Sequence, residues 1–176
     1  CFVYNSAKKV STFESSNRIF NAAHRLIEKA VRSNMQSVFT DCPHREKLGW
    51  LEQVHLNGPG LLYNYDLTAY APQIMQNMVD AQHSNGAMPT TAPEYVIFEG
   101  PGMDAFAESP EWGGSLVIFP FMYYETYGDD SLIKKYYPNM RRYVDYLKTR
   151  ADKGILSFGL GDWYDYGDFR AGFSRN

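Results

Sequence analysis

Apolar side chains recur at three- and four-residue steps over long segments of the chain, and this spacing restricts the fold to a largely helical one. The first such segment covers residues 18–38 and follows residues 15–17, which can cap a helix N-terminus. Its apolar stripe comprises Ile19, Phe20, Ala23, Leu26, Ile27, Ala30 and Val31. A second segment, residues 66–82, has the same periodicity and stops before Asn85 and Gly86. Both segments are predicted to be amphipathic helices.

Two further segments are apolar enough to be helices, but each contains a proline. Residues 112–127 hold a continuous apolar run that a buried strand could also explain. Because the segment is longer than a usual strand, we predict a buried helix with a kink at Pro120. The last helix is predicted over residues 131–150, where Pro138 is positioned to break it in two.

Four long helices and little strand predict an all-α fold in which helices pack as hairpins around a central axis. The opening residues 1–13 are compatible with a short strand or with an extended lead-in. A toroid of six helical hairpins needs twelve helices, two for each hairpin. At ordinary helix lengths this chain of 176 residues supplies well under half of them, so we expect an incomplete toroid.

Charge and composition exclude several classes of partner. The net charge is -3 and the basic residues are scattered, so nucleic acid is not expected to bind. No apolar run approaches the roughly 18 residues of a membrane helix. The chain begins without Met, which suggests that it was cut from a longer protein. The compartment is left open, although a secreted or periplasmic location is favoured over a cytoplasmic one. The oligomeric state is also left open. Aromatic residues make up 16% of the chain and suit sugar binding as well as packing.

The densest polar cluster lies between the first two helices, within residues 40–53. It brings together Asp41, Arg45, Glu46 and Trp50. An acid that donates a proton at neutral pH needs a raised pKa, which an apolar wall such as Trp50 and a second carboxylate such as Asp41 would supply, while Arg45 acts in the opposite direction. Alternatively, Asp41 caps a turn and pairs with Arg45, and Trp50 belongs to the core.

Cysteine and histidine residues give only a weak metal signal. Cys42, His44 and His55 lack the second ligand pair that a zinc site would show, and two cysteines make no disulfide framework. We therefore expect no metal ion and no organic cofactor.

A long connection, residues 87–110, is rich in proline and glycine and exceeds an ordinary loop, which is typical of a segment that lines or covers a site. Trp112 follows it, and Trp163 lies beyond the last predicted helix; each could form a stacking wall for a sugar or belong to the core. Asp162, next to a glycine, could accept a sugar hydroxyl or serve ordinary turn chemistry.

The string Asp41-Cys42-Pro43-x-Arg45-Glu46-x-Leu48-Gly49-Trp50 resembles the signature of the glycoside hydrolase family 78 α-L-rhamnosidases, whose catalytic domain is an (α/α)6 barrel. Three later strings, in the family's order, support the resemblance: Ser109-Pro110-Glu111-Trp112-Gly113, Tyr124-Glu125-x-Tyr127-Gly128-Asp129 and Gly161-Asp162-Trp163. The resemblance implies that residues 1–15 are an extended lead-in from a preceding domain and that residues 16–176 are part of the barrel.

The resemblance also implies site roles and a reaction. Glu46 would be the general acid of an inverting hydrolysis that removes terminal α-L-rhamnosyl groups from a glycoside or polysaccharide. The rhamnose pocket would be lined by Asp41, Arg45 and Trp50, and the further candidates for sugar contacts are Trp112, Asp162 and Trp163. Many family members carry an Asp shortly after the Trp, where this chain has Glu52 and Gln53, so which of these replaces it stays open. The general base would lie beyond residue 176, although Glu111 is a minor candidate.

Two other functions fit the same residues. The chain could belong to a carbohydrate-binding protein of the same fold that has lost turnover, or to a different helical-toroid glycosidase with another sugar preference. A structural helical repeat is disfavoured because no period of about 20 to 50 residues recurs in the sequence.

Overall fold

The computed structural model describes residues 4–161, and in that range its regular secondary structure is helical, with isolated β-bridges and no strand. The prediction of an all-α fold is confirmed. The helices are α1 (Arg18–Asn34), α2 (Glu52–Leu56), α3 (Gly58–Asn64), α4 (Ala71–Ala81), α5 (Asp104–Ala107), α6 (Pro110–Gly113), α7 (Ser115–Tyr127) and α8 (Ser131–Arg150). None of these helices is long and apolar enough to cross a membrane.

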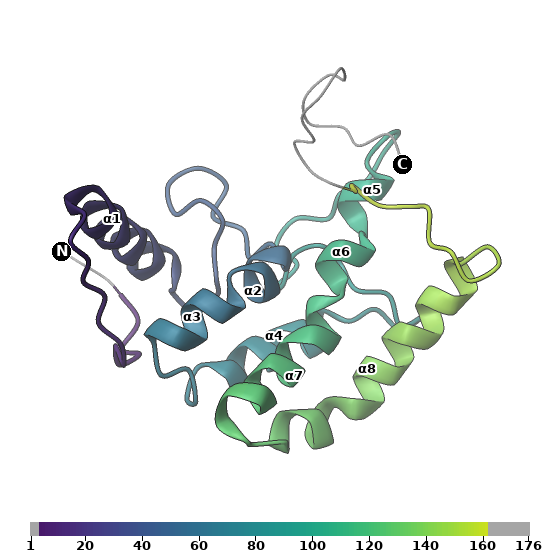
Figure 1. Ribbon diagram of the computed structural model, residues 1–176. Coiled ribbons are helices and arrows are strands. Elements are labelled where there is room, and N and C mark those ends of the chain that lie inside the picture. The colour runs from purple at the N-terminus through teal and green to yellow at the C-terminus, as the bar shows by residue number, and fades with distance from the viewer. Residues whose placement is uncertain (1–3, 162–176) are drawn as a thin grey trace.

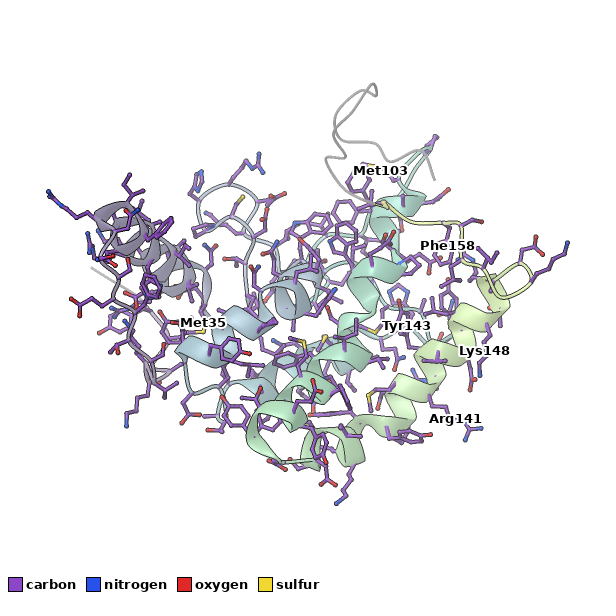
Figure 2. All side chains as sticks on the ribbon, in the orientation of Figure 1. Met35, Met103, Arg141, Tyr143, Lys148 and Phe158 are labelled. Carbon is purple, nitrogen blue, oxygen red and sulfur yellow. The ribbon has the colours of Figure 1, made fainter. Side chains whose placement is uncertain are left out.

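The core lies where α7 packs against α4 and α8. Figure 1 shows α7 and α8 as a hairpin, with α6 leading into α7 from above. Gly128 ends α7 in the left-handed conformation (φ 69°), which a glycine adopts without a Cβ clash, and the chain turns there into α8. On α8, Tyr143 lies on the side that faces α6 and α7, whereas Arg141 lies on the outer side (Figure 2). The helical hairpin expected from the sequence is therefore present.

Both predicted helices that contain an internal proline are present in the structure. The predicted helix at residues 112–127 is confirmed as helix rather than strand, although Gly114 separates α6 from α7. Pro120 lies inside α7 and is fully buried. The prediction that Pro138 breaks the last helix in two was wrong, because α8 runs unbroken for 20 residues. Buried Tyr136 and Met140 flank Pro138 and anchor both sides of it to the core, which offsets the backbone hydrogen bond that the proline cannot make.

The first helix is confirmed, but it is shorter than predicted and its apolar stripe is not buried. It ends at Asn34, whose side-chain carbonyl accepts a hydrogen bond from the Thr40 hydroxyl at 2.9 Å as the chain turns back. Ile19 and Leu26 remain 74% and 66% exposed. The reason is positional: α1 lies at one end of the molecule, away from the α7–α8 hairpin (Figure 1).

The segment between the first two predicted helices holds two helices that the sequence did not reveal, α2 and α3, which run almost end to end (Figure 1). The next helix, α4, begins at Ala71 rather than at Asp66. Asp66 instead accepts hydrogen bonds from the backbone and hydroxyl of Thr68, at 3.0 and 2.7 Å, in a turn that competes with helix.

The opening residues form an extended lead-in, as one of the two alternatives predicted. Residues 4–14 contain no helix, and Lys9 makes a single antiparallel bridge with Tyr65. Backbone hydrogen bonds from Val10 to Asn64 and from Asp66 to Lys8, at 2.9 and 2.8 Å, hold this segment against the end of α3.

Candidate active site

The signature string forms a compact loop between α1 and α2. The backbone N–H of Lys47 donates to the carbonyl of Cys42 at 3.0 Å, and the N–H of Asp41 donates to the carbonyl of Leu48 at 3.2 Å. These two bonds close the loop on itself, so that Asp41 and the residues around Glu46 lie close together. Lys47 adopts φ 60° at the tip, a conformation that few residues with a side chain accept.

The same loop packs along the start of the long connection. The carbonyl of Gly49 accepts a hydrogen bond from the N–H of Ala92 at 2.9 Å, and the N–H of Leu51 donates to Thr90 at 2.9 Å. A Cβ at Gly49 would lie 2.5 Å from the Ala92 carbonyl oxygen, so only glycine permits this approach. The long connection thus lines the site, as its length predicted.

A cavity of about 490 Å³ opens beside the loop. It is lined by Asp41, Arg45, Glu46, Trp50, Glu52, Gln53, Phe106, Trp112 and Leu160. The structure therefore brings five of the seven predicted site residues to one cavity. The other two, Asp162 and Trp163, lie outside the described residues.

Glu46 is half-buried and is paired with Arg45. The guanidinium Nη2 of Arg45 lies 3.1 Å from Oε1 of Glu46, and this contact raises the pKa of Arg45. Asp41 accepts a hydrogen bond from the Cys42 thiol at 3.2 Å, so the alternative in which Arg45 pairs with Asp41 does not hold. Arg45 is 72% exposed, which leaves its other donors open to a ligand in the cavity.

Asp41, Cys42 and Glu46 offer ligand atoms within 4.8 Å of one another, the one such cluster among residues 4–161. The hydrogen bond to Asp41 raises the pKa of the Cys42 thiol, which favours the protonated form over the thiolate that binds metals. His55 lies elsewhere, with its Nδ1 2.5 Å from the hydroxyl of Ser115. Cys42, His44 and His55 therefore do not form the weak zinc set considered from the sequence.

Glu52 is the site residue whose character the sequence could not reveal. It begins α2, and burial raises the pKa of its carboxyl to about 7, with smaller raising contributions from Asp41 and Glu46. Its Oε1 accepts a hydrogen bond from the Gln53 amide at 2.8 Å, whereas its Oε2 is buried without a hydrogen-bond partner among the described residues. Both Glu52 and Gln53 line the cavity. Either residue could therefore take the place of the Asp that many members of the resembled family carry shortly after the Trp.

Aromatic side chains form the apolar walls. Trp50 is half-buried and stacks on Phe98, with ring centroids 5.4 Å apart and an angle of 28° between the planes. Phe98 in turn contacts Phe106 at 5.9 Å. Trp112 is only 6% exposed, and its indole Nε1 is buried without a hydrogen-bond partner in the described part of the chain. The sequence analysis missed Phe98 and Phe106, because isolated aromatics in a loop carry no periodic signal.

Ser109 and Glu111 hold residues 160–161 in place through hydrogen bonds. The Ser109 hydroxyl donates to Oε2 of Glu111 at 2.6 Å and accepts the N–H of Leu160 at 2.8 Å. Oε1 of Glu111 accepts the N–H of Gly161 at 2.9 Å. These bonds hold residues 160–161 against the start of α6 and place Leu160 on the cavity wall, while Glu111 itself does not line it.

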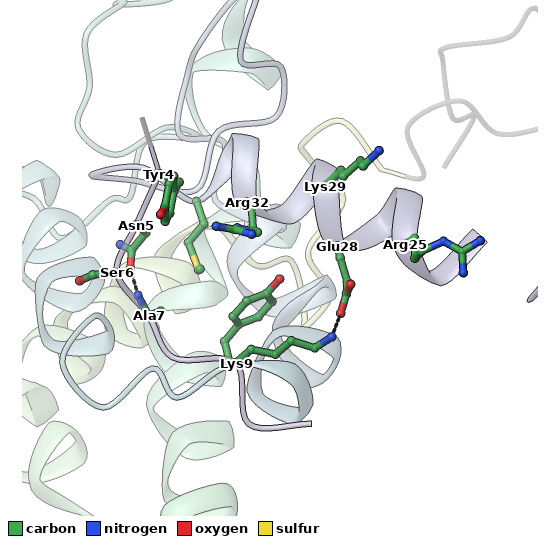
Figure 3. A pocket seen from close by; sticks show the side chains of 11 residues that line it. Tyr4, Asn5, Ser6, Ala7, Lys9, Arg25, Glu28, Lys29 and Arg32 are labelled. Atoms are coloured by element: carbon green, nitrogen blue, oxygen red, sulfur yellow. Dashed lines mark hydrogen bonds and ion pairs between the residues drawn. The ribbon is translucent and has the colours of Figure 1, made fainter. Parts of the chain in front are cut away.

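A second cavity, of about 440 Å³, lies between the lead-in and α1 (Figure 3). The basic residues among its lining are Lys9, Arg25, Lys29 and Arg32, and the guanidinium of Arg32 stacks over the Tyr4 ring at 4.4 Å. Glu28 is the one carboxylate among its lining residues, and the ion pair with Lys9 lowers its pKa. A lowered pKa is the reverse of what a proton donor needs, so this cavity does not offer a general acid.

Residues 8–176 match the model of a protein family described as the bacterial α-L-rhamnosidase 6 hairpin glycosidase domain. An α-L-rhamnosidase of Formosa agariphila is 32% identical over 92% of this chain and 17% of its own length. An α-L-rhamnosidase of Streptomyces avermitilis is 30% identical over 94% of this chain and 16% of its own length.

Solved structures agree with the sequence matches. The α-L-rhamnosidase of Dictyoglumus thermophilum superposes with a TM-score of 0.83 at 27% identity, covering 95% of this chain and 18% of that chain. The Streptomyces avermitilis α-L-rhamnosidase complexed with L-rhamnose also gives 0.83 at 27% identity, covering 96% and 16%. The chain therefore spans less than a fifth of the length of each of these relatives.

Proposed function

Because the chain belongs to the bacterial α-L-rhamnosidase 6 hairpin glycosidase family, we propose that the protein hydrolyses terminal α-L-rhamnosyl groups from a glycoside or polysaccharide. The observation that carries the proposal is the cavity in which Glu46, Asp41 and Arg45 meet Trp50 and Trp112. Carboxylates and a guanidinium beside apolar aromatic walls are the groups that a sugar ring requires, since its hydroxyls need hydrogen bonds and its C–H faces need apolar contact.

In the proposed mechanism Glu46 is the general acid. Its carboxyl protonates the glycosidic oxygen as the bond to the anomeric carbon breaks, and Arg45 holds the carboxyl in position through the 3.1 Å contact. Trp50 forms the apolar wall, and Asp41 accepts hydrogen bonds from the sugar. An inverting enzyme needs a second carboxylate about 6.5–9.5 Å away to activate water on the opposite face of the ring. We propose that this base lies beyond residue 176.

A comparison of substrates tests the proposed function. The full-length protein is expected to release L-rhamnose from an α-L-rhamnosyl disaccharide glycoside and to leave the matching α-D-glucosyl compound intact, as measured by chromatography of the free sugars. Residues 1–176 alone serve as the negative control, because this piece would lack the base. A preference for the glucosyl compound would favour a different helical-toroid glycosidase, and rhamnose binding without release would favour the carbohydrate-binding protein. Turnover by residues 1–176 would contradict the proposed position of the base.

A further inference from the structure

The cavity between the lead-in and α1 (Figure 3) has a surplus of positive charge. Four basic side chains line it against a single carboxylate, that of Glu28, in a chain whose net charge is -3. Glu28 is already paired with Lys9. The other three basic residues, Arg25, Lys29 and Arg32, form no ion pair with any residue that the structure describes. The cavity therefore favours an anionic ligand.

A buried tyrosine in the same cavity is a second, independent sign of a ligand. Tyr65 is only 4% exposed and lines the cavity from the end of α3. Burial raises the pKa of its phenol, Glu28 raises it further, and Arg32 and Lys9 lower it, so the hydroxyl lies within electrostatic reach of all three charges. This hydroxyl makes no hydrogen bond to any described residue. Because buried hydroxyls almost always have a partner, an unpaired one beside a cavity points to a ligand that accepts hydrogen bonds.

Arg32 and Tyr4 form the opposite wall. The Arg32 guanidinium lies 4.4 Å from the centroid of the Tyr4 ring, and Figure 3 shows Arg32 reaching toward Tyr4, whereas Arg25 and Lys29 extend outward from α1. Stacking occupies one flat face of the guanidinium and leaves the N–H groups along its edge available. Those groups match the oxygen atoms of a carboxylate or a similar oxyanion.

We propose that this cavity binds a sugar that carries a carboxylate or sulfate group, with Arg32 and Tyr65 donating hydrogen bonds to the anion. Its volume of about 440 Å³ lies in the range of small-molecule sites and is sufficient for one sugar ring. The inference rests on the proposed function in taking this sugar as one unit of the rhamnose-containing substrate. It narrows the substrate class to an acidic polysaccharide.

Calorimetric titration of the full-length protein with three sugars that share one ring tests the inference. The probes are D-glucuronate, D-glucose 6-sulfate and neutral D-glucose, with excess L-rhamnose present to occupy the cavity beside Glu46. We expect at least one acidic sugar to bind about tenfold or more tightly than D-glucose. Its affinity should fall as salt is added, because the attraction is electrostatic. The acid that binds more tightly identifies the anionic group.

Two substitutions and a matched control locate the binding. Arg32→Gln removes the charge and should weaken binding of the acidic sugar by about 10- to 100-fold, the range for a hydrogen bond to a charged group. Tyr65→Phe removes only the hydroxyl and should weaken it by about 3- to 10-fold. Arg141→Gln removes an arginine that is 73% exposed on the outer side of α8, and this variant should bind as the wild type does.

Several results would overturn the inference. They are D-glucose binding as tightly as both acids, no binding of either acid by the wild type, and folded Arg32→Gln and Tyr65→Phe variants that bind as tightly as the wild type. Inorganic sulfate bound as tightly as the acidic sugars would contradict a role for the sugar ring. The comparison of the three sugars needs no substitution, so it decides the matter even if a variant fails to fold.

Kinetics and binding separate this inference from the proposed function. Arg32→Gln should raise the KM for an acidic rhamnose-containing polysaccharide by a larger factor than the KM for a neutral rhamnosyl disaccharide glycoside, because only the polysaccharide carries the anion. If acidic sugars bind as expected but no α-L-rhamnoside is hydrolysed, the hydrolase function is contradicted and the anion site stands. If rhamnosides are hydrolysed but neither acidic sugar binds, only the anion site is contradicted.

Discussion

Replacing Glu46 with Gln in the full-length protein should lower kcat on an α-L-rhamnosyl disaccharide glycoside by roughly 10²- to 10⁴-fold. The amide has nearly the shape of the carboxyl and can still accept from Arg45 at the position of the present 3.1 Å contact, but it cannot donate an acidic proton. A sugar is a poor leaving group that departs only with protonation, so loss of the acid falls on the chemical step. Steady-state kinetics with a sugar leaving group measures the effect.

Two controls make this result specific. A nitrophenyl rhamnoside, whose leaving group departs with little help from an acid, should lose far less activity in the same variant. Glu125→Gln removes an exposed carboxylate from α7 and should leave both rates unchanged. An unchanged rate for folded Glu46→Gln on the disaccharide, with circular dichroism as the check on folding, would make the signature loop structural and move the proton donor elsewhere.

The second large effect concerns the core. Phe119 lies on α7 with 0% exposure, in the cluster that joins α4, α7 and α8. Phe119→Ala should lower the free energy of unfolding by about 3–5 kcal/mol, because it removes a large buried side chain and leaves a cavity that close-packed neighbours fill only in part. Urea unfolding of the full-length protein, followed by circular dichroism, measures this loss.

Phe121, two residues further along the same helix, offers a matched comparison. It has the same side chain but is 53% exposed, so its truncation removes much less buried surface. We expect Phe121→Ala to cost less than about 1.5 kcal/mol. Equal losses for the two variants would contradict the packing of α7 described above.

The long helices were predictable because their apolar periodicity is a local property of the sequence. α7 and α8 lie where the pattern predicts helices. α8 continues through Pro138 because the core packs against the helix on both sides of the proline. Burial is not local in the same way. The stripe on α1 predicts a helix correctly but cannot indicate which neighbour covers it, and no other part of residues 4–161 buries any residue of that helix.

The candidate site was predictable to a similar extent. The signature string supplies Asp41, Arg45, Glu46 and Trp50, so a tight loop is enough to bring them together. Trp112 is distant from them in the sequence and lines the same cavity only because of the fold. The environment of Glu52 could not be predicted, because its raised pKa depends on burial by residues distant in the sequence. The Ser109 and Glu111 contacts with residues 160–161 likewise join segments about 50 residues apart, and only the three-dimensional arrangement reveals that they position the cavity wall.

Proton NMR of the first product tests the central claim most directly. An α-L-rhamnosyl glycoside is mixed with the full-length protein, and the anomers of the released sugar are followed before mutarotation mixes them. If Glu46 is the acid and the base is a second carboxylate beyond residue 176, hydrolysis inverts the anomeric carbon. β-L-rhamnose then appears first, and the α-anomer follows only as the sugar equilibrates. Initial release of α-L-rhamnose would contradict inversion, and no release of rhamnose would contradict the proposed hydrolase function itself.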